Sequence, residues 1–221
     1  MLEQIINVDK DLMVILNASG NHNLFADTFM WLSSQMLTWL PFYLALAFVT
    51  IKDKKKESIL IIICALLTVL LCDQISSGLL KPLVARLRPS HDPSIMDALE
   101  YVKDYKGGPY GFPSSHASNT FGLALFFSLL LKNRLATTLL FTWATISAYS
   151  RIYLGVHFPT DIIVGITIGL LSSLLCYKLY IKSRQRTRLH NEASFKPRSG
   201  LIVATSITLT IAGIFIVSAT A

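Results

Sequence analysis

The chain has 221 residues, of which 52% are hydrophobic and only 15% are charged, and its mean hydropathy is +0.53. This composition is too apolar for an ordinary soluble domain of this length and predicts an integral membrane protein. The net charge of +7 could suggest a nucleic-acid partner, but thirteen of the twenty Lys and Arg lie in three short linkers between apolar segments. We therefore exclude nucleic acid as a partner.

The N-terminal residues are expected to form a short amphipathic helix. Its apolar positions are Leu2, Ile5, Ile6, Leu12, Met13 and Leu16. This pattern suits a helix that lies on the membrane surface, and it suits a helix packed on the protein's own bundle equally well. Three carboxylates interrupt the stretch and no long apolar run follows them, so we do not expect a cleaved signal peptide.

Six later stretches are apolar and are close to the length that crosses a bilayer, which needs ~20 residues per helix. They cover approximately 34–51, 58–80, 117–131, 135–150, 160–181 and 200–219. The fold class predicted from them is an all-α, polytopic transmembrane helical bundle of about six spans.

The three basic linkers predict the orientation of this bundle. They cover 52–56, 132–134 and 178–198, and each joins two spans on the same side of the membrane. Positive loops are typical of the cytoplasmic side, so the loops after the second and fourth spans should face outward. Those loops hold the sequences KPLVARLRPS, PSSH and SRIYLGVHFPTD.

A pair of cations follows the second apolar segment. Lys81 and Arg88 are seven residues apart, close to two helical turns, so both would point the same way if the helix continued past Pro82, whereas Arg86 would point elsewhere. Two converging cations beside a membrane favour an anionic ligand, and Lys with Arg suits a phosphate. The alternative is that both side chains extend to lipid headgroups.

The stretch from Pro113 to His116 predicts a helix start. Pro113 is typical of a first helical turn, and the chain becomes apolar after His116. Ser114 and Ser115 would then lie beside unpaired backbone N–H groups, which together with the helix dipole bind anions. A serine pair in this place could also be a simple N-cap.

A second helix start is predicted at Pro159, with His157 just before it and Asp161 in its first turn. A carboxylate so placed can accept a hydrogen bond from the imidazole, fix its tautomer and expose the other ring nitrogen as a nucleophile or base. A local helix cap is the alternative for this pair.

Together these pieces resemble the type 2 phosphatidic acid phosphatase (PAP2) superfamily, whose signature is K-x6-R-P, P-S-G-H and S-R-x5-H-x3-D. The matching residues are Lys81 to Arg88-Pro89, Pro113-Ser114-Ser115-His116, and Ser150-Arg151 through His157 to Asp161. The resemblance covers roughly residues 55–180. Ser115 departs from it, because the pattern prefers glycine there and a positive φ would cost a serine more.

What the resemblance implies is hydrolysis of a phosphate ester or diphosphate through a phosphohistidine. His157 would attack, Asp161 would orient it, and His116 would protonate the leaving oxygen. The groups implied to bind the phosphoryl oxygens are Lys81, Arg88, Arg151, Ser114 and the amide of Ser115. No metal or other cofactor is implied, because the cations can neutralise phosphate and the carboxylate cluster that Mg²⁺ prefers is missing from the motifs.

The predicted organisation has four parts. Residues 1–30 are an interfacial segment, 31–181 the PAP2-like transmembrane catalytic bundle, 182–199 a basic cytoplasmic linker and 200–221 an additional C-terminal transmembrane helix. The expected function is a lipid phosphatase of the inner membrane, with its site facing outward and undecaprenyl diphosphate as the first choice of substrate. Lipid A or phosphatidylglycerophosphate is the alternative within this class, and a non-hydrolytic phospholipid-binding transporter is the alternative outside it.

Overall fold

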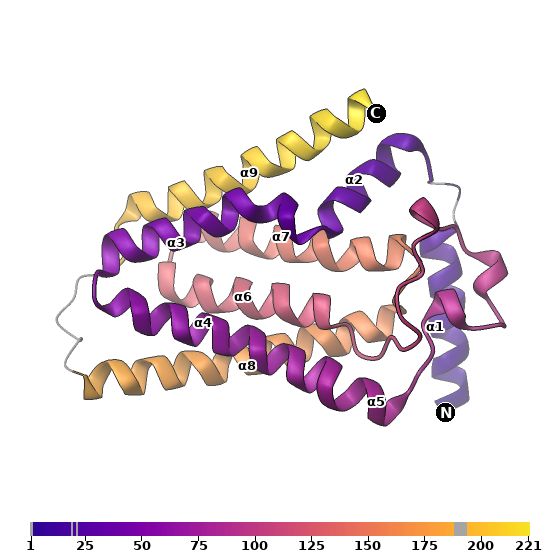
Figure 1. Cartoon of the computed structure of the whole chain (residues 1–221), viewed down its shortest axis with the longest axis horizontal. Helices are drawn as coiled ribbons and strands as arrows, with labels where there is room; N and C mark the ends of the chain where they lie inside the picture. Colours follow the sequence, from indigo (N-terminus) through magenta and orange to yellow (C-terminus); the bar gives the residue numbers. More distant parts are fainter. Residues whose placement is uncertain (1, 19, 21, 188–193) are drawn as a thin grey trace.

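The computed structural model describes residues 2–18, 20, 22–187 and 194–221, and the described chain is a bundle of long helices without strands (Figure 1). The helices are α1 (Leu2–Asn17), α2 (Leu24–Ser34), α3 (Leu40–Lys54), α4 (Glu57–Asp73), α5 (Lys81–Val84), α6 (Ser115–Leu131), α7 (Arg134–Tyr153), α8 (Pro159–Arg186) and α9 (Pro197–Thr220). Short 3₁₀ turns cover Met36–Trp39, Pro89–His91, Met96–Ala98 and Val102–Asp104. The predicted all-α class is confirmed.

Four of the described helical segments are long and apolar enough to cross a bilayer. They are Met36–Lys54, Glu57–Val84, Pro159–Arg186 and Pro197–Thr220. The apolar helix Ser115–Leu131 is shorter, and it lies inside the bundle against α7 and α8. The predicted number of six spans therefore stays a prediction.

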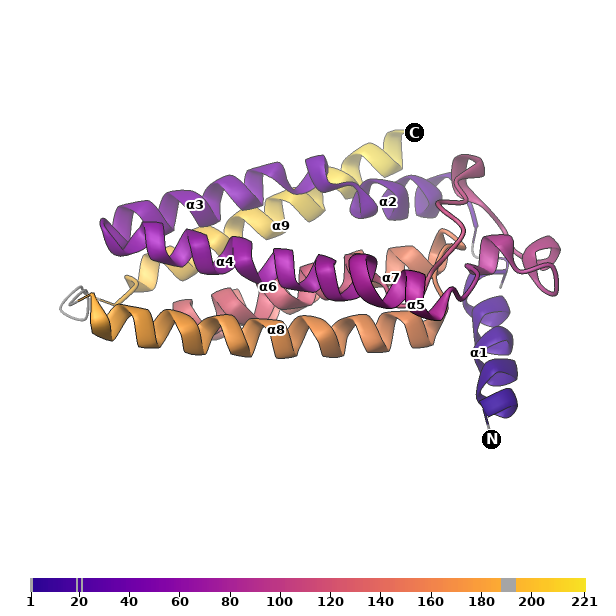
Figure 2. The ribbon, with the colours of Figure 1, turned by 60° about the horizontal axis from the view of Figure 1, so that its bottom comes forward.

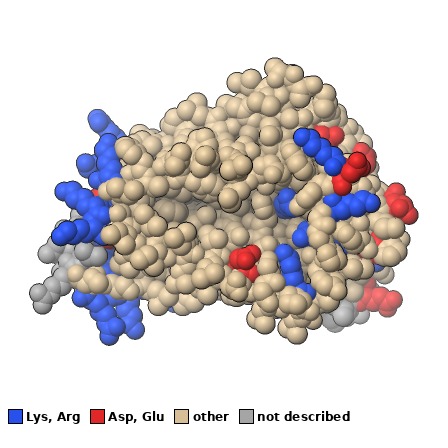
Figure 3. Space-filling view, in the orientation of Figure 1, with Lys and Arg blue, Asp and Glu red and all other residues tan. Residues whose placement is uncertain are grey.

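Charged side chains gather at the two ends of the bundle, with an apolar belt between them (Figure 3). One end, called the basic end below, carries the turns from α3 to α4 and from α6 to α7, together with the C-terminal end of α8 and the N-terminal end of α9. Its exposed cations are Lys52, Lys55, Lys56, Lys132, Arg134, Lys182, Arg186, Lys196 and Arg198. The belt exposes large apolar side chains such as Phe48, Leu66 and Leu171, which suits a lipid-facing surface.

The backbones of α6 and α8 come into close contact. A Cβ atom at Gly165 would lie 2.4 Å from the carbonyl oxygen of Ser114, and one at Gly169 would lie 2.4 Å from that of Ser118. Only glycine lets the two backbones approach so closely, as small residues four apart do in membrane helices. This contact places the beginnings of α6 and α8 side by side.

The second span is interrupted before it reaches the cations that follow it. Gln74–Leu80 forms a π-helical stretch between α4 and α5, just before Pro82, which lacks an N–H and cannot fit a regular helix interior. The helix then ends at Val84, and Ala85 adopts a left-handed φ of 48°. A helix that continues to Arg88, the condition under which Lys81 and Arg88 would align, is therefore not formed.

Helix α1 lies across the end of the bundle opposite the basic end, roughly perpendicular to the long helices in both ribbon views (Figure 2). Asp9, Met13 and Asn17 form its buried edge, and the Asn17 side chain donates a 2.7 Å hydrogen bond to the carbonyl of Tyr153. Several apolar residues of the helix remain exposed, namely Ile5, Ile6, Val8, Leu12 and Ile15. The helix thus packs on the bundle and also presents an apolar face, whose placement on a membrane stays a prediction.

We expect Gly165→Ala to destabilise the protein by roughly 1–3 kcal/mol, because the added methyl group would overpack the contact with Ser114. The matched control is Gly213→Ala in α9, where an added Cβ meets nothing within 4 Å and where alanine is the better helix former. Thermal unfolding in detergent measures both. Equal midpoints for the two variants would contradict the close-contact argument.

Candidate active site

The two predicted helix starts are confirmed, and they touch. Helix α6 begins at Ser115, and its N-cap Ser114 accepts a hydrogen bond from the Ala117 amide. Helix α8 begins at Pro159. The backbone N–H of Ser114 donates to the carbonyl of Asp161 over 3.0 Å, so the start of one helix is bonded to the first turn of the other.

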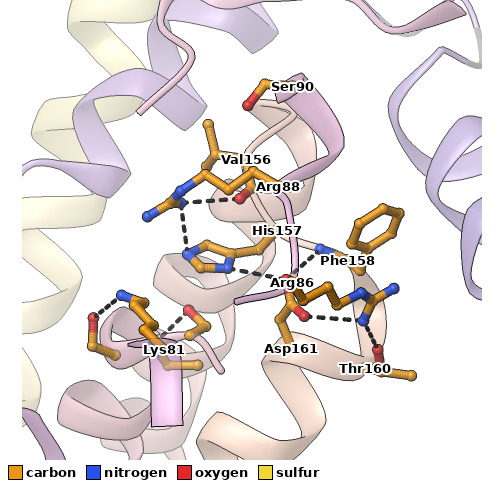
Figure 4. A network of polar contacts seen from close by, with 12 residues as sticks. Lys81, Arg86, Arg88, Ser90, Val156, His157, Phe158, Thr160 and Asp161 are labelled. Atoms are coloured by element: carbon orange, nitrogen blue, oxygen red, sulfur yellow. Dashed lines mark hydrogen bonds and ion pairs between the residues drawn. The ribbon is translucent and has the colours of Figure 1, made fainter. Parts of the chain in front are cut away.

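His157 lies immediately before α8 and is 2% exposed. Its Nδ1 is 3.3 Å from Oδ2 of Asp161, and its Nε2 is 3.0 Å from Nη1 of Arg88 (Figure 4). A guanidinium group can only donate hydrogen bonds, so Nε2 must present its lone pair and Nδ1 must carry the proton. Asp161 accepts a hydrogen bond from this Nδ1–H group and also a 3.0 Å hydrogen bond from the Phe158 amide. The pair therefore has the tautomer that a nucleophilic Nε2 requires.

Three cations surround this imidazole from separate elements. Lys81 of α5 donates to the hydroxyls of Ser77 and Ser115 over 3.3 and 3.2 Å, and Arg88 also donates to the carbonyl of Val156. Arg151 of α7 is 7% exposed and donates to the hydroxyl of Tyr105 over 3.2 Å.

The two arginines retain unused donors. Among the described residues, the buried Nε atoms of Arg88 and Arg151 have no hydrogen-bond partner. Unpaired donors of buried cations are costly, and a tetrahedral oxyanion would satisfy them.

Burial, followed by the positive charges of Arg88, Arg151 and Lys81, holds the pKa of His157 well below its usual value. Both causes disfavour the imidazolium. The imidazole is therefore neutral near pH 7, with its lone pair available. A bound phosphate dianion would offset part of the cationic field, so the imidazole should become more basic once a phosphoryl group arrives.

His116 is the second residue of α6, and it is partly exposed. It lines a cavity of about 160 Å³ together with Gln35, Tyr43 and Asn119. The buried Oδ1 of Asn119 has no partner among the described residues. A reacting group held near His116 thus has beside it a mainly apolar recess that carries a few polar groups.

All the predicted site residues meet at this end of the bundle, although their catalytic and binding roles stay predictions. The members are Lys81, Arg88, Ser114, Ser115, His116, Arg151, His157 and Asp161. Ser115 is absent from the non-glycine residues with positive φ in the described chain. Its substitution for the motif glycine therefore brings no such strain, and its hydroxyl gains the bond from Lys81.

Sequence reasoning missed Arg86, which it expected to point away. The Nη1 of Arg86 donates to Oδ1 of Asp161 over 3.1 Å. Residues 86–88 are not helical, and Leu87 forms an isolated antiparallel bridge with Tyr110. Alternate residues of an extended segment share a face, so Pro82 as a helix breaker was the signal that Arg86 and Arg88 would turn together toward the site.

Within the part of the chain that is described, no three His, Cys, Asp or Glu side chains are grouped so that they could hold an ion. The expectation of a metal-free site stays a prediction.

The chain is similar to a known protein family and to individual members of it. The model of the PAP2 superfamily matches residues 62–185. The chain is 42% identical over 186 residues to a lipid A 4'-phosphatase of Porphyromonas gingivalis, covering 84% of this chain and 78% of that protein. It is 33% identical over 224 residues to a lipid A 4'-phosphatase of Bacteroides thetaiotaomicron, covering 99% and 98%.

A solved structure supports the same fold. The crystal structure of Aquifex aeolicus LpxE superposes with a TM-score of 0.56 at 24% identity, covering 76% of this chain and 93% of that one. At this identity the likeness concerns the helical architecture alone.

We expect His157→Ala to remove nearly all turnover, because no other described side chain takes the place of its Nε2. His116→Ala should cost on the order of 10²–10⁴-fold with a lipid substrate and much less with nitrophenyl phosphate, whose leaving group needs little protonation. Phosphate release measures turnover, and neutral quenching followed by detection of phosphohistidine identifies the labelled residue.

His91→Ala is the matched histidine control, since its imidazole contacts the Ser90 hydroxyl and not the Asp161 carboxylate. Substantial turnover by His157→Ala, or a phosphoryl label on His116, would overturn the assigned roles.

Proposed function

Because the chain belongs to the PAP2 superfamily of membrane lipid phosphatases, we propose that it hydrolyses the 4'-phosphate monoester of a lipid A-type glycolipid through a phosphohistidine. One observation carries the choice of substrate. The two relatives that match across 84% and 99% of this chain are both lipid A 4'-phosphatases. A likeness over this length includes α1, α2 and α9 in at least one case, and therefore extends beyond the catalytic signature.

This proposal replaces undecaprenyl diphosphate, the first choice from the sequence, by the alternative within the same class. The signature residues do not distinguish these lipids, because they contact only the phosphoryl group. The non-hydrolytic transporter is set aside, since the chain's family and its relatives are phosphatases.

The arrangement suits a two-step transfer. Nε2 of His157 attacks phosphorus while Lys81, Arg88 and Arg151 bind the equatorial oxygens, and the bond from phosphorus to the sugar oxygen breaks. Burial and the charge of Arg151 lower the pKa of His116 to about 3, so His116 must take up a proton as the bound dianion offsets that charge. The imidazolium then gives this proton to the sugar oxygen, so the sugar leaves as an alcohol. Water then attacks the phosphohistidine, His116 takes its proton back, and the phosphorus–nitrogen bond breaks to release inorganic phosphate.

The cavity beside His116 supports a polar leaving group. In-line displacement puts the leaving oxygen opposite the attacking nitrogen, and this cavity borders His116 without bordering the three cations or His157. Its wall includes the amides of Gln35 and Asn119 and the hydroxyl of Tyr43. The rest of the wall is largely apolar and includes Met36 and Trp39, so the polar groups offer a few hydrogen bonds to the hydroxyl and amide groups of an acylated sugar within a mainly apolar recess.

The orientation belongs to the same proposal. The positive-inside rule favours a cytoplasmic basic end, and the site lies at the opposite end of the bundle. We infer an inner-membrane enzyme whose site opens toward the exterior, where a phosphate at the interface can reach the cations while the acyl chains stay in the bilayer.

In an assay of purified enzyme, we expect the highest kcat/KM with a lipid A-type 4'-phosphate and lower values with undecaprenyl diphosphate, phosphatidylglycerophosphate and nitrophenyl phosphate. Asn119→Leu should lower kcat/KM for the glycolipid on the order of tenfold, the effect of about one lost hydrogen bond, and should leave nitrophenyl phosphate hydrolysis unchanged. Each substrate is assayed with and without EDTA.

A preference of the wild-type enzyme for undecaprenyl diphosphate would refute the substrate. Equal losses on both substrates in Asn119→Leu would refute the leaving-group recess. Activity that EDTA abolishes and Mg²⁺ restores would refute the proposal that the reaction needs no metal.

We expect a membrane-impermeant maleimide added to intact cells to label Asp97→Cys and to spare Arg186→Cys. Both residues are exposed, and the turn Met96–Ala98 and the C-terminal end of α8 lie at opposite ends of the bundle. The native Cys64, Cys72 and Cys176 are buried, which keeps the background low. Labelling after permeabilisation is the control for reactivity. The reverse pattern would overturn the orientation and with it the outer-leaflet substrate.

A further inference from the structure

Arg86 directs its guanidinium group to the rear of the catalytic pair rather than to the phosphate-binding cations. Its Nη1 donates to Oγ1 of Thr160 over 2.7 Å and to Oδ1 of Asp161 over 3.1 Å (Figure 4). Its central carbon lies 4.0 Å from the centre of the Phe158 ring. The side chain therefore packs beside the residues that begin α8.

Asp9 of α1 completes this arrangement from a distant part of the chain. It is 2% exposed, and its Oδ2 accepts a 2.6 Å hydrogen bond from Nη2 of Arg86. Its Oδ1 accepts a 3.0 Å bond from the backbone N–H of Thr160. Phe158, the N-cap residue of α8, has no side-chain acceptor, so Asp9 acts as the cap of that helix start from another helix.

The contacts of Asp161 show why Arg86 matters to His157. Oδ2 of Asp161 accepts bonds from the Phe158 amide and from Nδ1 of His157, while Oδ1 accepts the bond from Arg86. Without Arg86, Oδ1 would lose its charged partner in a buried site and the carboxylate could rotate. Gly111 packs against the other oxygen of the Asp161 carboxylate, because a Cβ at this position would lie 2.9 Å from Oδ2.

We propose that Arg86, held by Asp9 of α1, is a positioning residue that keeps the Asp161 carboxylate ionised and aligned with Nδ1 of His157. Arg86 acts through Asp161 and not through the substrate, so it supports kcat rather than binding. Helix α1 thereby becomes part of the catalytic apparatus. The proposal rests on the His157–Asp161 assignment, whose own failure would show separately as an active His157→Ala variant.

Substitution of Arg86 and substitution of Asp9 should shift the pKa of the His157–Asp161 pair in opposite directions. Charged or titratable groups around the pair come from every neighbouring element, namely Lys81, Arg86, Arg88, His116, Arg151 and Asp9. Arg86→Gln removes a cation, so the pair binds a proton at higher pH and the acid limb of kcat/KM moves up by roughly one pH unit. Asp9→Asn removes an anion, so the same limb moves down.

We expect Arg86→Gln to lower kcat on the order of 10- to 100-fold, as loss of an outer partner of a functional histidine does, with KM nearly unchanged. Asp9→Asn should lower kcat less, because Arg86 keeps its bonds to Thr160 and Asp161. Arg86→Lys should retain the wild-type acid limb but not the full kcat, since one ammonium group cannot bridge the same oxygens. Nitrophenyl phosphate and lipid substrate are both assayed over pH 4–9, a range of about five units around the His reference pKa.

Asp11→Asn, an exposed change on α1, is the matched control and should leave kcat and the acid limb at wild-type values. Asn17 and the ion pair of Lys10 with Asp92 also anchor α1, so Asp9→Asn should remain folded, which thermal unfolding checks. Wild-type kcat in Arg86→Gln would overturn the proposal. A loss of kcat would also overturn it if the acid limbs of kcat/KM in Arg86→Gln and Asp9→Asn stayed at the wild-type pH or moved in the same direction.

Discussion

The backbone contact between α6 and α8 is the constraint on which the site depends. Gly165 and Gly169 let these helices approach until carbonyl oxygens of one face the α-carbons of the other. Two helix starts are thereby fixed beside each other, one beginning at Ser115 and the other at Pro159. That contact therefore sets the positions of His116 in α6 and of His157 just before α8. Larger residues would separate the helices and with them the two groups proposed to attack and to protonate.

The charge distribution around His157 follows from this geometry. Lys81, Arg88 and Arg151 enclose one imidazole, and Asp161 balances only part of their charge. The excess disfavours a second proton on the ring and attracts a dianion, so the same field would serve both the proposed nucleophile and its substrate. Arg86 would have added to that excess, but its ion pair with Asp9 neutralises its charge locally. Arg86 can therefore support Asp161.

The bundle also explains how a lipid phosphate could be reached. The cations lie at one end of an apolar belt and the basic linkers at the other. A phosphate at the interface is therefore level with the site while hydrocarbon chains remain beside the lipid-facing helices. The recess next to His116, whose mainly apolar wall carries a few polar groups, is proposed to contact the alcohol rather than the phosphate, and substrate choice should depend on it.

The sequence by itself determined the helical class, the helix starts after Phe112 and Phe158, and the pairing of His157 with Asp161. These are local relations, set by apolar runs, proline and a four-residue spacing. Only the tertiary structure decided that Arg88 reaches His157 from a non-helical segment, that Arg86 contacts Asp161, and that Asp9 contacts Arg86 and Thr160. Those contacts join segments at least 69 residues apart, and they depend on where the helix ends after Pro82 and how α1 packs, which no local pattern specifies.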